Sequence, residues 1–384
     1  MKFKKVLSLV LACTMVMATL TACGGSAGSK TEDGAGSVFK IGGIGPVTGG
    51  AAVYGIAVQR GAELAVEEIN AAGGVNGVQI EFQFEDDEHD AEKSINAYNT
   101  LKDWNMQMLM GTVTSTPCQA VAEKTKEDNM FMLTPSGSAV PCIQYDNAFR
   151  VCFSDPNQGL ASAKYIGENG LASKVAVIYN SSDVYSQGIY EKFAGEAANQ
   201  PFEIVAAEQF TTDSATDFSV QLKKAQDAGA ELVFLPIYYQ EASLILQQAD
   251  AMGFAPKFFG CDGLDGLLGV ENFDTSLAEG VMLLTPFVAG DDDFSKDFKA
   301  KFGEDPIQFA ADAYDAIYIM KAAMEKAGVT PDMSVSDMCD KMKEAMTQIT
   351  VDGTTGSGMT WSADGEPTKE PKAMVIEGGQ YVAM

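Results

Sequence analysis

The sequence has a single histidine, His89, among 384 residues. A Ser-His-Asp or Cys-His nucleophile needs a histidine as its base, and a zinc site needs several His or Cys ligands at close spacing. His89 lies in an acidic run, Glu85 to Asp90, which lacks the alternating carboxylates of a calcium loop. We therefore interpret His89 as a solvated loop residue and predict no metal site and no enzymatic activity.

Basic residues are also few. The chain has 26 Lys and Arg against 53 Asp and Glu, and its formal net charge is −27. A field this negative repels phosphate backbones, so binding of nucleic acid is excluded. With 46% hydrophobic and 9% aromatic residues, the acidity is not that of a disordered chain. The sequence predicts a folded, acidic protein of roughly two or three domains.

Phosphate-binding loops are missing as well. The segment Gly43 to Thr48 begins like a dinucleotide fingerprint, but Thr48 stands where the third small residue belongs, and Pro46 lacks an amide hydrogen. No G-x-x-x-x-G-K-[ST] sequence occurs. A G-x-S-x-G match at Gly24 to Gly28 lacks the predicted strand and helix that a nucleophile elbow requires on its two sides. We expect no nucleotide and no other cofactor.

The first residues are typical of a secretory signal. An apolar run, Val6 to Leu20, follows three lysines and is shorter than the roughly 20 residues of a membrane-spanning helix. The sequence LTAC that ends at Cys23 resembles the lipobox of bacterial lipoproteins, whose cysteine is acylated and becomes the first residue of the mature chain. We predict a signal peptide over residues 1–22, a lipid anchor at Cys23 and a flexible tether over residues 23–37. The chain would then lie on the extracytoplasmic face of the cell membrane, as Gram-positive-type lipoproteins do; the alternative is an ordinary cysteine beside a simple cleavage site.

From Phe39 onward, short apolar runs alternate with longer segments of helical period. This alternation is typical of βαβ units, and it occurs in two halves that divide near Asp155-Pro156. The sequence therefore predicts an α/β fold of two doubly wound parallel-sheet lobes. The predicted strands are residues 39–44, 78–84, 106–110, 130–133, 175–179, 203–207, 232–236, 257–259 and 281–284. The predicted helices are residues 54–71, 91–104, 115–128, 157–169, 184–199, 218–228, 241–252, 294–302 and 309–327.

Hydroxyl groups lie in the loops after the predicted strands, where doubly wound sheets bind their ligands. Ser115 precedes the first turn of a predicted helix, so its hydroxyl and the free amides there could hold an anion. Ser136 and Ser138 form a second such loop after the neighbouring strand. Plain N-capping by Ser115 is equally expected from the sequence, and both interpretations stay open.

Tyrosines and one aspartate occupy similar loops. Tyr54, Tyr185 and Tyr238 lie at strand ends or helix starts, and Asp262 follows another predicted strand. Aromatic walls with few polar groups suit a small zwitterion, because hydroxyls and amides bind its carboxylate and Asp262 binds its ammonium. For each tyrosine, simple packing with a solvated hydroxyl is the alternative.

At these residues the chain is similar to the solute-binding proteins of ABC importers for leucine, isoleucine and valine, a family with type I periplasmic-binding-protein folds. The similarity extends over nearly all of the mature chain. It rests on Ile41 to Gly45 with Tyr54-Gly55, Gly61-Ala62, Ala65 to Asn70, Gly73 to Gly77, Glu85 to Asp87, Gly111 to Thr116, Leu133 to Ser138, Phe149-Arg150, Tyr185 with Gly188, Asp217-Phe218 and Gly260 to Gly263.

The resemblance implies a Venus-flytrap protein that closes over a free amino acid and delivers it to ABC permease subunits. Its N-terminal lobe would comprise residues 38–154 and 286–357, and its C-terminal lobe residues 155–285 and 358–384, joined by a three-segment hinge. We expect a monomer. The implied ligand-binding residues are Tyr54, Ser115, Ser136, Ser138, Tyr185, Tyr238 and Asp262.

Two departures from the family pattern concern the site. Asp262 is one methylene shorter than the glutamate often found there, and the cysteines of the family's first-lobe disulfide are missing. A different bridge, between Cys118 and Cys142, would brace the carboxylate-binding loops; buried free thiols are the alternative.

Other ligands and roles also remain open. The same fold could bind a short amide, urea or an aromatic acid in place of an amino acid. It could also serve as a ligand-sensing receptor module, reporting the ligand to a membrane partner.

Overall fold

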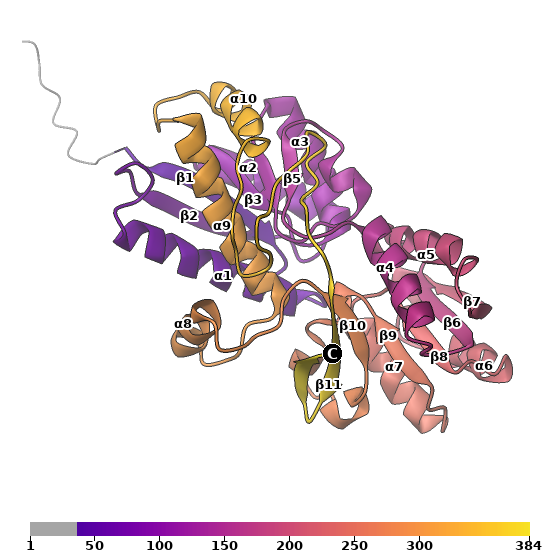
Figure 1. The fold of residues 1–384 in the computed structure, drawn as a ribbon. Helices are drawn as coiled ribbons and strands as arrows, with labels where there is room; N and C mark the ends of the chain where they lie inside the picture. The colour runs from indigo at the N-terminus through magenta and orange to yellow at the C-terminus, as the bar shows by residue number, and fades with distance from the viewer. Residues whose placement is uncertain (1–36) are drawn as a thin grey trace, which may run out of the picture. The chain divides into compact units, whose positions relative to one another are not determined.

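The computed structural model describes residues 37–384, so the predicted signal peptide, Cys23 and nearly all of the predicted tether lie outside the described residues. Two β-sheets organise the described part of the chain (Figure 1). The first has the order β2 (Ile80–Asp86), β1 (Phe39–Gly45), β3 (Met108–Gly111), β4 (Met132–Thr134), β5 (Ala148–Arg150). The second has the order β12 (Gln380–Ala383), β11 (Lys372–Glu377), β10 (Met282–Thr285), β9 (Lys257–Gly260), β8 (Leu232–Leu235), β6 (Lys174–Asn180), β7 (Glu203–Phe210).

The two sheets share one winding pattern. All strand pairs of the first sheet are parallel, and so are the pairs that join β7, β6, β8, β9 and β10 in the second. The antiparallel pairs of the second sheet are β10 with β11 and β11 with β12. In the first sheet β1 lies between β2 and β3, and in the second β6 lies between β7 and β8. Numbered along the chain within each sheet, the parallel strands therefore have the doubly wound order 2-1-3-4-5. The predicted fold class is confirmed. Such sheets bind ligands where the winding reverses, here between β1 and β3 and between β6 and β8.

Helices connect the strands. They are α1 (Ala52–Ala71), α2 (Ala91–Asp103), α3 (Ser115–Asp128), α4 (Asp155–Glu168), α5 (Val184–Ala197), α6 (Ser219–Asp227), α7 (Tyr239–Ala251), α8 (Asp293–Phe302), α9 (Gln308–Ala327) and α10 (Val335–Met346). In α1, Val58, Ala62, Ala65 and Ile69 recur at helical spacing and are all buried, so this stripe packs into the core. None of the helices in residues 37–384 is both long enough and apolar enough to cross a bilayer.

Glycine allows α1 and α9 to approach closely. A Cβ atom on Gly61 would lie 2.0 Å from the carbonyl oxygen of Ala310, far inside van der Waals contact. We expect Gly61→Ala to lower the free energy of unfolding by about 1–3 kcal/mol, the usual range for overpacking. Gly195→Ala is the matched control, because Gly195 lies in α5 with nothing within 4 Å of its Cβ position.

The control should instead raise the free energy of unfolding by about 0.5–1 kcal/mol, because alanine restricts the unfolded chain and favours helix. Urea denaturation of the two variants measures both values. Equal effects of the two substitutions would contradict the close approach of α1 and α9.

The chain after Ser357, where the last crossover between the lobes is predicted, contacts the first sheet. Trp361 donates its indole N–H to the carbonyl of Arg150 at 2.8 Å, and the amide of Arg150 donates to the carbonyl of Gly365 at 3.1 Å. These contacts keep the segment that follows Ser357 on β5 of the first sheet. The division of the chain into lobes stays a proposal, in which we now place the third crossover between Lys369 and β11.

Candidate ligand-binding site

The seven predicted ligand-binding residues line one cavity of about 10 Å³, room for about one water molecule, against the roughly 300–1,000 Å³ of drug-sized sites. They come from loops and first helical turns after β1, β3 and β4 of the first sheet and after β6, β8 and β9 of the second. The carboxyl ends of both sheets thus meet at this cavity, as the doubly wound order predicts. The residues that line it are Tyr54, Val113, Thr114, Ser115, Ser136, Ser138, Tyr185, Tyr238, Asp262, Gly263 and Phe309.

The first sheet supplies hydroxyls and a helix start. Ser115 is the first residue of α3, after the N-cap Thr114, whose side chain makes no capping bond. The hydroxyl oxygen of Ser115 accepts the amide of Ala139 at 3.2 Å, so the structure does not support plain N-capping as its role. The Ser136 hydroxyl donates to the carbonyl of Val113 at 2.7 Å, which ties the two loops together. The positive end of α3 faces the same cavity and favours a bound anion.

The second sheet supplies the acidic group. The Tyr185 hydroxyl donates to Oδ1 of Asp262 at 2.7 Å and accepts the amide of Gly263 at 3.0 Å. Burial raises the pKa of Asp262 to about 7, and the bond from Tyr185 opposes that rise. A cationic group beside Asp262 would therefore relieve the cost of burying its negative charge.

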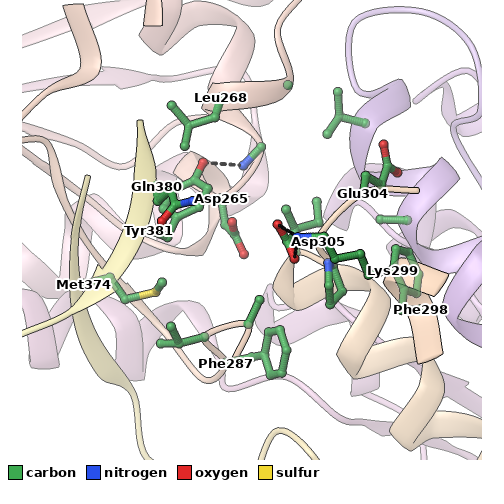
Figure 2. Close-up of a pocket in the computed structure, with 18 of the residues that line it drawn as sticks. Asp265, Leu268, Phe287, Phe298, Lys299, Glu304, Asp305, Met374, Gln380 and Tyr381 are labelled. Atoms are coloured by element: carbon green, nitrogen blue, oxygen red, sulfur yellow. Dashed lines mark hydrogen bonds and ion pairs between the residues drawn. The ribbon is translucent and has the colours of Figure 1, made fainter. Parts of the chain in front are cut away.

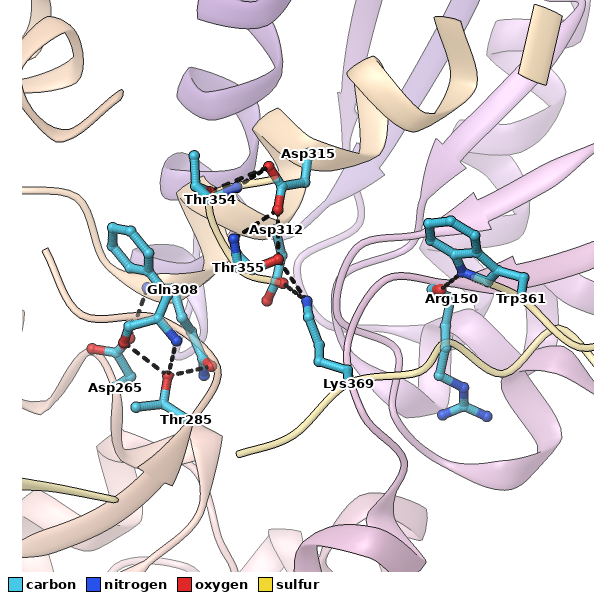
Figure 3. A network of polar contacts seen from close by, with 11 residues as sticks. Arg150, Asp265, Thr285, Gln308, Asp312, Asp315, Thr354, Thr355, Trp361 and Lys369 are labelled. Atoms are coloured by element: carbon cyan, nitrogen blue, oxygen red, sulfur yellow. Dashed lines mark hydrogen bonds and ion pairs between the residues drawn. The ribbon is translucent and has the colours of Figure 1, made fainter. Parts of the chain in front are cut away.

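Two glutamines fix the backbone around Asp262. Its amide donates to Oε1 of Gln158 at 3.3 Å, and its carbonyl accepts Nε2 of Gln308 at 2.9 Å. Gln308 is held in turn by the Thr285 hydroxyl at 2.7 Å and begins α9, where its amide donates to Asp265 at 2.7 Å (Figure 3). Neither glutamine was predicted, because no local sequence pattern links them to the strand-end loops.

Aromatic rings form the remaining wall. The ring of Tyr238 stacks on that of Tyr185, with centroids 4.7 Å apart, and meets the edge of Tyr54 at 5.8 Å. The Tyr54 hydroxyl donates to the carbonyl of Gly263 at 2.5 Å and accepts the amide of Tyr239 at 3.2 Å, so it links the first sheet to the second. Phe309 packs on Tyr54 at 4.2 Å. Phe309 lies at the start of α9, which follows α8 and not a strand. The search of the loops that follow strands therefore did not include it.

His89 requires a correction, since it is not a solvated loop residue. Its Nδ1 lies 2.8 Å from the Thr114 hydroxyl, and its ring meets Tyr238 edge to face at 5.5 Å. The residue is half-buried, and burial lowers the pKa of its imidazole. The burial of His89 could not be predicted from the acidic run around it, because a run of carboxylates is typical of an exposed loop.

A wider groove of about 460 Å³ contains none of the predicted residues (Figure 2). Asp265, Leu268, Phe287 and Tyr381 line it, and Lys299 forms an ion pair with Asp305 at 2.9 Å on its other wall. Burial raises the pKa of Asp265 to about 7. The Asp265 carboxylate accepts the amide of Gln308 at the start of α9 and does not line the smaller cavity. The groove is therefore separate from the predicted ligand-binding residues.

The cysteines are free thiols in the structure. Cys118, Cys142, Cys152, Cys261 and Cys339 are all buried and unpaired within residues 37–384. The Cys142 thiol donates to the carbonyl of Ser115 at 3.6 Å, next to the cavity. A bridge between Cys118 and Cys142 stays a prediction.

The chain is similar to known proteins over most of its length. The family model described as "Periplasmic binding protein" matches residues 38–380. The chain is 31% identical to Leu/Ile/Val-binding protein homolog 3 of Brucella melitensis over 76% of this chain and 80% of that one. It is 28% identical to the leucine-, isoleucine-, valine-, threonine-, and alanine-binding protein of Pseudomonas aeruginosa over 90% and 91% of the two chains.

A solved structure is similar over a comparable length. The branched-chain amino acid transporter substrate binding protein LivJ of Streptococcus pneumoniae, in complex with isoleucine, superposes with a TM-score of 0.80. Its identity to this chain is 26%, and the match covers 90% of this chain and 100% of that one.

Proposed function

The chain belongs to the periplasmic binding protein family, and we propose that it binds a free amino acid with an apolar, branched-chain or similar side chain and delivers it to the permease of an ABC importer. Its relatives are substrate-binding transport proteins, in agreement with the predicted lack of enzymatic activity. The proposed ligand-binding residues are the seven that the sequence indicates, together with Val113, Thr114, Gly263 and Phe309.

The distribution of charge in the cavity supports this proposal most strongly. Among the residues that line it, Asp262 is the one charged group, and no Lys, Arg or His is among them. Once the cavity widens to admit a ligand, an α-ammonium would pair with Asp262 and Tyr185, and an α-carboxylate with Ser115, Ser138 and the start of α3. The side chain would then meet Val113, Tyr238 and Phe309, which offer apolar contact.

The alternative ligands each leave one part of the site without a partner. An aromatic acid has no ammonium, so Asp262 would stay buried and unpaired next to a second anion. Urea and short amides carry no carboxylate for the positive end of α3. An amino acid matches both ends of the site at once.

The proposal extends to the membrane. With Cys23 acylated, the tether of residues 23–37 would hold the binding domain at the extracytoplasmic face, within reach of the permease. We propose that the protein acts there as a monomer. Closure over the ligand would couple binding to transport, provided that the ligand binds the closed form more tightly than the open one.

Calorimetry with matched ligands tests the proposed function. We expect L-leucine, L-isoleucine or L-valine to bind, and leucinamide and 4-methylpentanoate, which lack the carboxylate and the ammonium respectively, to bind more weakly by about 1.5–3 kcal/mol each. Urea, acetamide and benzoate complete the panel. Tighter binding of any of these three than of every amino acid would overturn the proposal.

A further inference from the structure

His89 joins two parts of the protein that surround the cavity. It follows β2 of the first sheet, whereas Tyr238 is the N-cap residue of α7 and follows β8 of the second. The imidazole meets the ring of Tyr238 at 5.5 Å, and Tyr238 stacks on Tyr185, which holds Asp262. The histidine thus contacts Tyr238, one of the aromatic residues that line the ligand cavity.

The loop around His89 is built to hold the ring in place. Glu88 and His89 both have left-handed backbone conformations, with φ of 49° and 60°. The amide of Glu88 donates to the Asp86 carboxylate and that of His89 to the Asp87 carboxylate, both at 2.9 Å. Asp90 caps α2 through the amides of its first turn at 2.9 Å. The acidic run therefore fixes the loop rather than leaving it free in solvent.

A second contact between the same two parts lies beside the histidine. The Thr116 hydroxyl on α3 donates to Oδ1 of Asp183 at 3.2 Å, and Asp183 caps α5 through the amide of Ser186 at 3.2 Å. Asp183 faces His89 closely enough for each to affect the titration of the other. The ring and this carboxylate thus lie together where the first sheet's loops meet the second's.

We propose that His89 is a positioning residue that holds the protein closed over its ligand, and that protonation of its ring favours opening and release. This inference rests on the proposed function, because it concerns closure around a bound amino acid. His89 does not line the cavity, so it acts on the ligand through Tyr238.

The direction of the pH effect follows from the surroundings of the ring. Burial lowers the pKa of His89, and this outweighs the opposing influence of Asp183 on α5 and Asp90 on its own loop. The other titratable groups nearby are Asp87, next to it in the loop, and Tyr238 with Glu241 at the start of α7. An open form returns the ring to solvent and to a pKa of about 6.5. The ring of His89 therefore releases its proton on closure, and its own contribution favours the open form in acid. Burial raises the pKa values of Asp183, Asp87 and Glu241, which contribute in the opposite direction, so the effect of the ring is read from the difference between the wild type and a variant without it.

Because the chain has one histidine, proton NMR reports this ring without ambiguity. The ring's pKa would be measured in the full chain, free and saturated with L-leucine or whichever amino acid calorimetry selects. We expect a lower pKa in the loaded protein. An amino acid that binds without changing the pKa of His89 would overturn the inference and leave the proposed function intact, whereas failure of every amino acid to bind would overturn both.

A pair of variants separates the role of the ring from that of the loop. His89→Asn keeps a residue that tolerates the left-handed backbone, and Glu88→Asn is the matched control at the exposed neighbouring position. We expect His89→Asn to raise Kd about threefold to tenfold at pH 7.5, the range of an aromatic contact, and Glu88→Asn to change it less than twofold. Between pH 7.5 and 5.5 the affinity of the wild type should also fall more steeply than that of His89→Asn. Parallel pH profiles of the two proteins would contradict the proposal.

Discussion

Replacing Asp262 by Asn should weaken the binding of L-leucine by about 10- to 150-fold, the equivalent of about 1.5–3 kcal/mol for a hydrogen bond to a charged group. The substitution preserves the shape of the side chain and removes its charge. The proposed ammonium partner is lost, while the Tyr185 hydroxyl keeps an oxygen to which it can donate. The effect should therefore be on affinity rather than on the arrangement of the cavity.

The stability of this variant should change in the opposite direction. Burial raises the pKa of Asp262 to about 7, so the native state binds its proton more tightly than the unfolded chain, in which an aspartate titrates at about 3.9. Between these values the contribution of Asp262 to stability falls as the pH rises, and above pH 7 the whole penalty is present. Asp262→Asn should hence raise the free energy of unfolding more at pH 8 than at pH 5.

Asp265→Asn is the matched control for this experiment. Asp265 is equally buried, and burial raises its pKa to about 7 as well, but its carboxylate contacts the start of α9 and it lines the wider groove. We expect it to change leucine affinity less than threefold. Calorimetry gives the affinities, and urea denaturation at pH 5 and pH 8 gives the stabilities. Equal losses of leucine affinity in Asp262→Asn and Asp265→Asn would contradict the proposal that Asp262 binds the ligand.

The placement of the site could be predicted because it follows from topology. Parallel strands present their carboxyl ends at one edge, so hydroxyls and rings after several strands must come together once the sheets form. Tyr54, Ser115 and Asp262 are far apart in sequence, yet they line one cavity. The helical period of the sequence predicted the helix over residues 115–128, and these are the bounds of α3.

The strands that could not be predicted from the sequence are stabilised by tertiary contacts. Strand β5 is three residues long and ends in Arg150, a residue whose side chain is fully buried. That guanidinium donates to the carbonyls of Gly137, Ser138 and Ala139, and no local pattern reveals such partners. The hairpin of β11 and β12 was missed too, because it follows a long segment without helical or strand period.

Helix α10 was missed for a related reason. Its buried residues are Met338, Cys339, Met342, Ala345 and Met346, and methionine and cysteine give a weaker periodic signal than leucine or valine. Packing against α9 and the core makes the segment helical. Local propensity alone is a weak guide where tertiary contacts decide the structure.

The largest loss of stability should come from Lys369→Met. The Lys369 side chain is fully buried, with Nζ 2.8 Å from Oδ1 of Asp312 and 2.7 Å from the Thr355 hydroxyl (Figure 3). Removing one partner of a buried ion pair leaves the other charge without compensation, at a cost of about 3–5 kcal/mol. Here the remaining carboxylate also lies near Asp315, a second negative group.

The loss should depend on pH in a way that identifies its cause. Burial already raises the pKa of Asp312 to about 6, although Lys369 acts against that rise. Without the lysine the pKa should rise further, so Asp312 can take up a proton at pH 5 and become neutral. The destabilisation by Lys369→Met should be smaller at pH 5 than at pH 8.

A second substitution distinguishes loss of charge balance from loss of packing. Adding Asp312→Asn to Lys369→Met removes the unpaired charge at nearly constant volume, and we expect it to restore more than half of the lost free energy of unfolding. Urea denaturation of the single and double variants gives the coupling between the two sites. If the double variant is as unstable as Lys369→Met, the ion pair is not what holds this segment.

The buried pair bears on function through the third crossover, which we propose to follow Lys369. Thr355 donates its hydroxyl and amide to Asp315 at 2.5 and 2.9 Å, so the chain before Lys369 is held on α9 at Thr355 and, through Trp361, on β5. In the proposed division into lobes, the few residues between Lys369 and β11 bend as the lobes close. We propose that the buried pair sets where this part of the hinge begins, so Lys369→Met should weaken leucine binding by loosening closure, whereas Gly195→Ala in α5, with nothing within 4 Å of its Cβ position, should not.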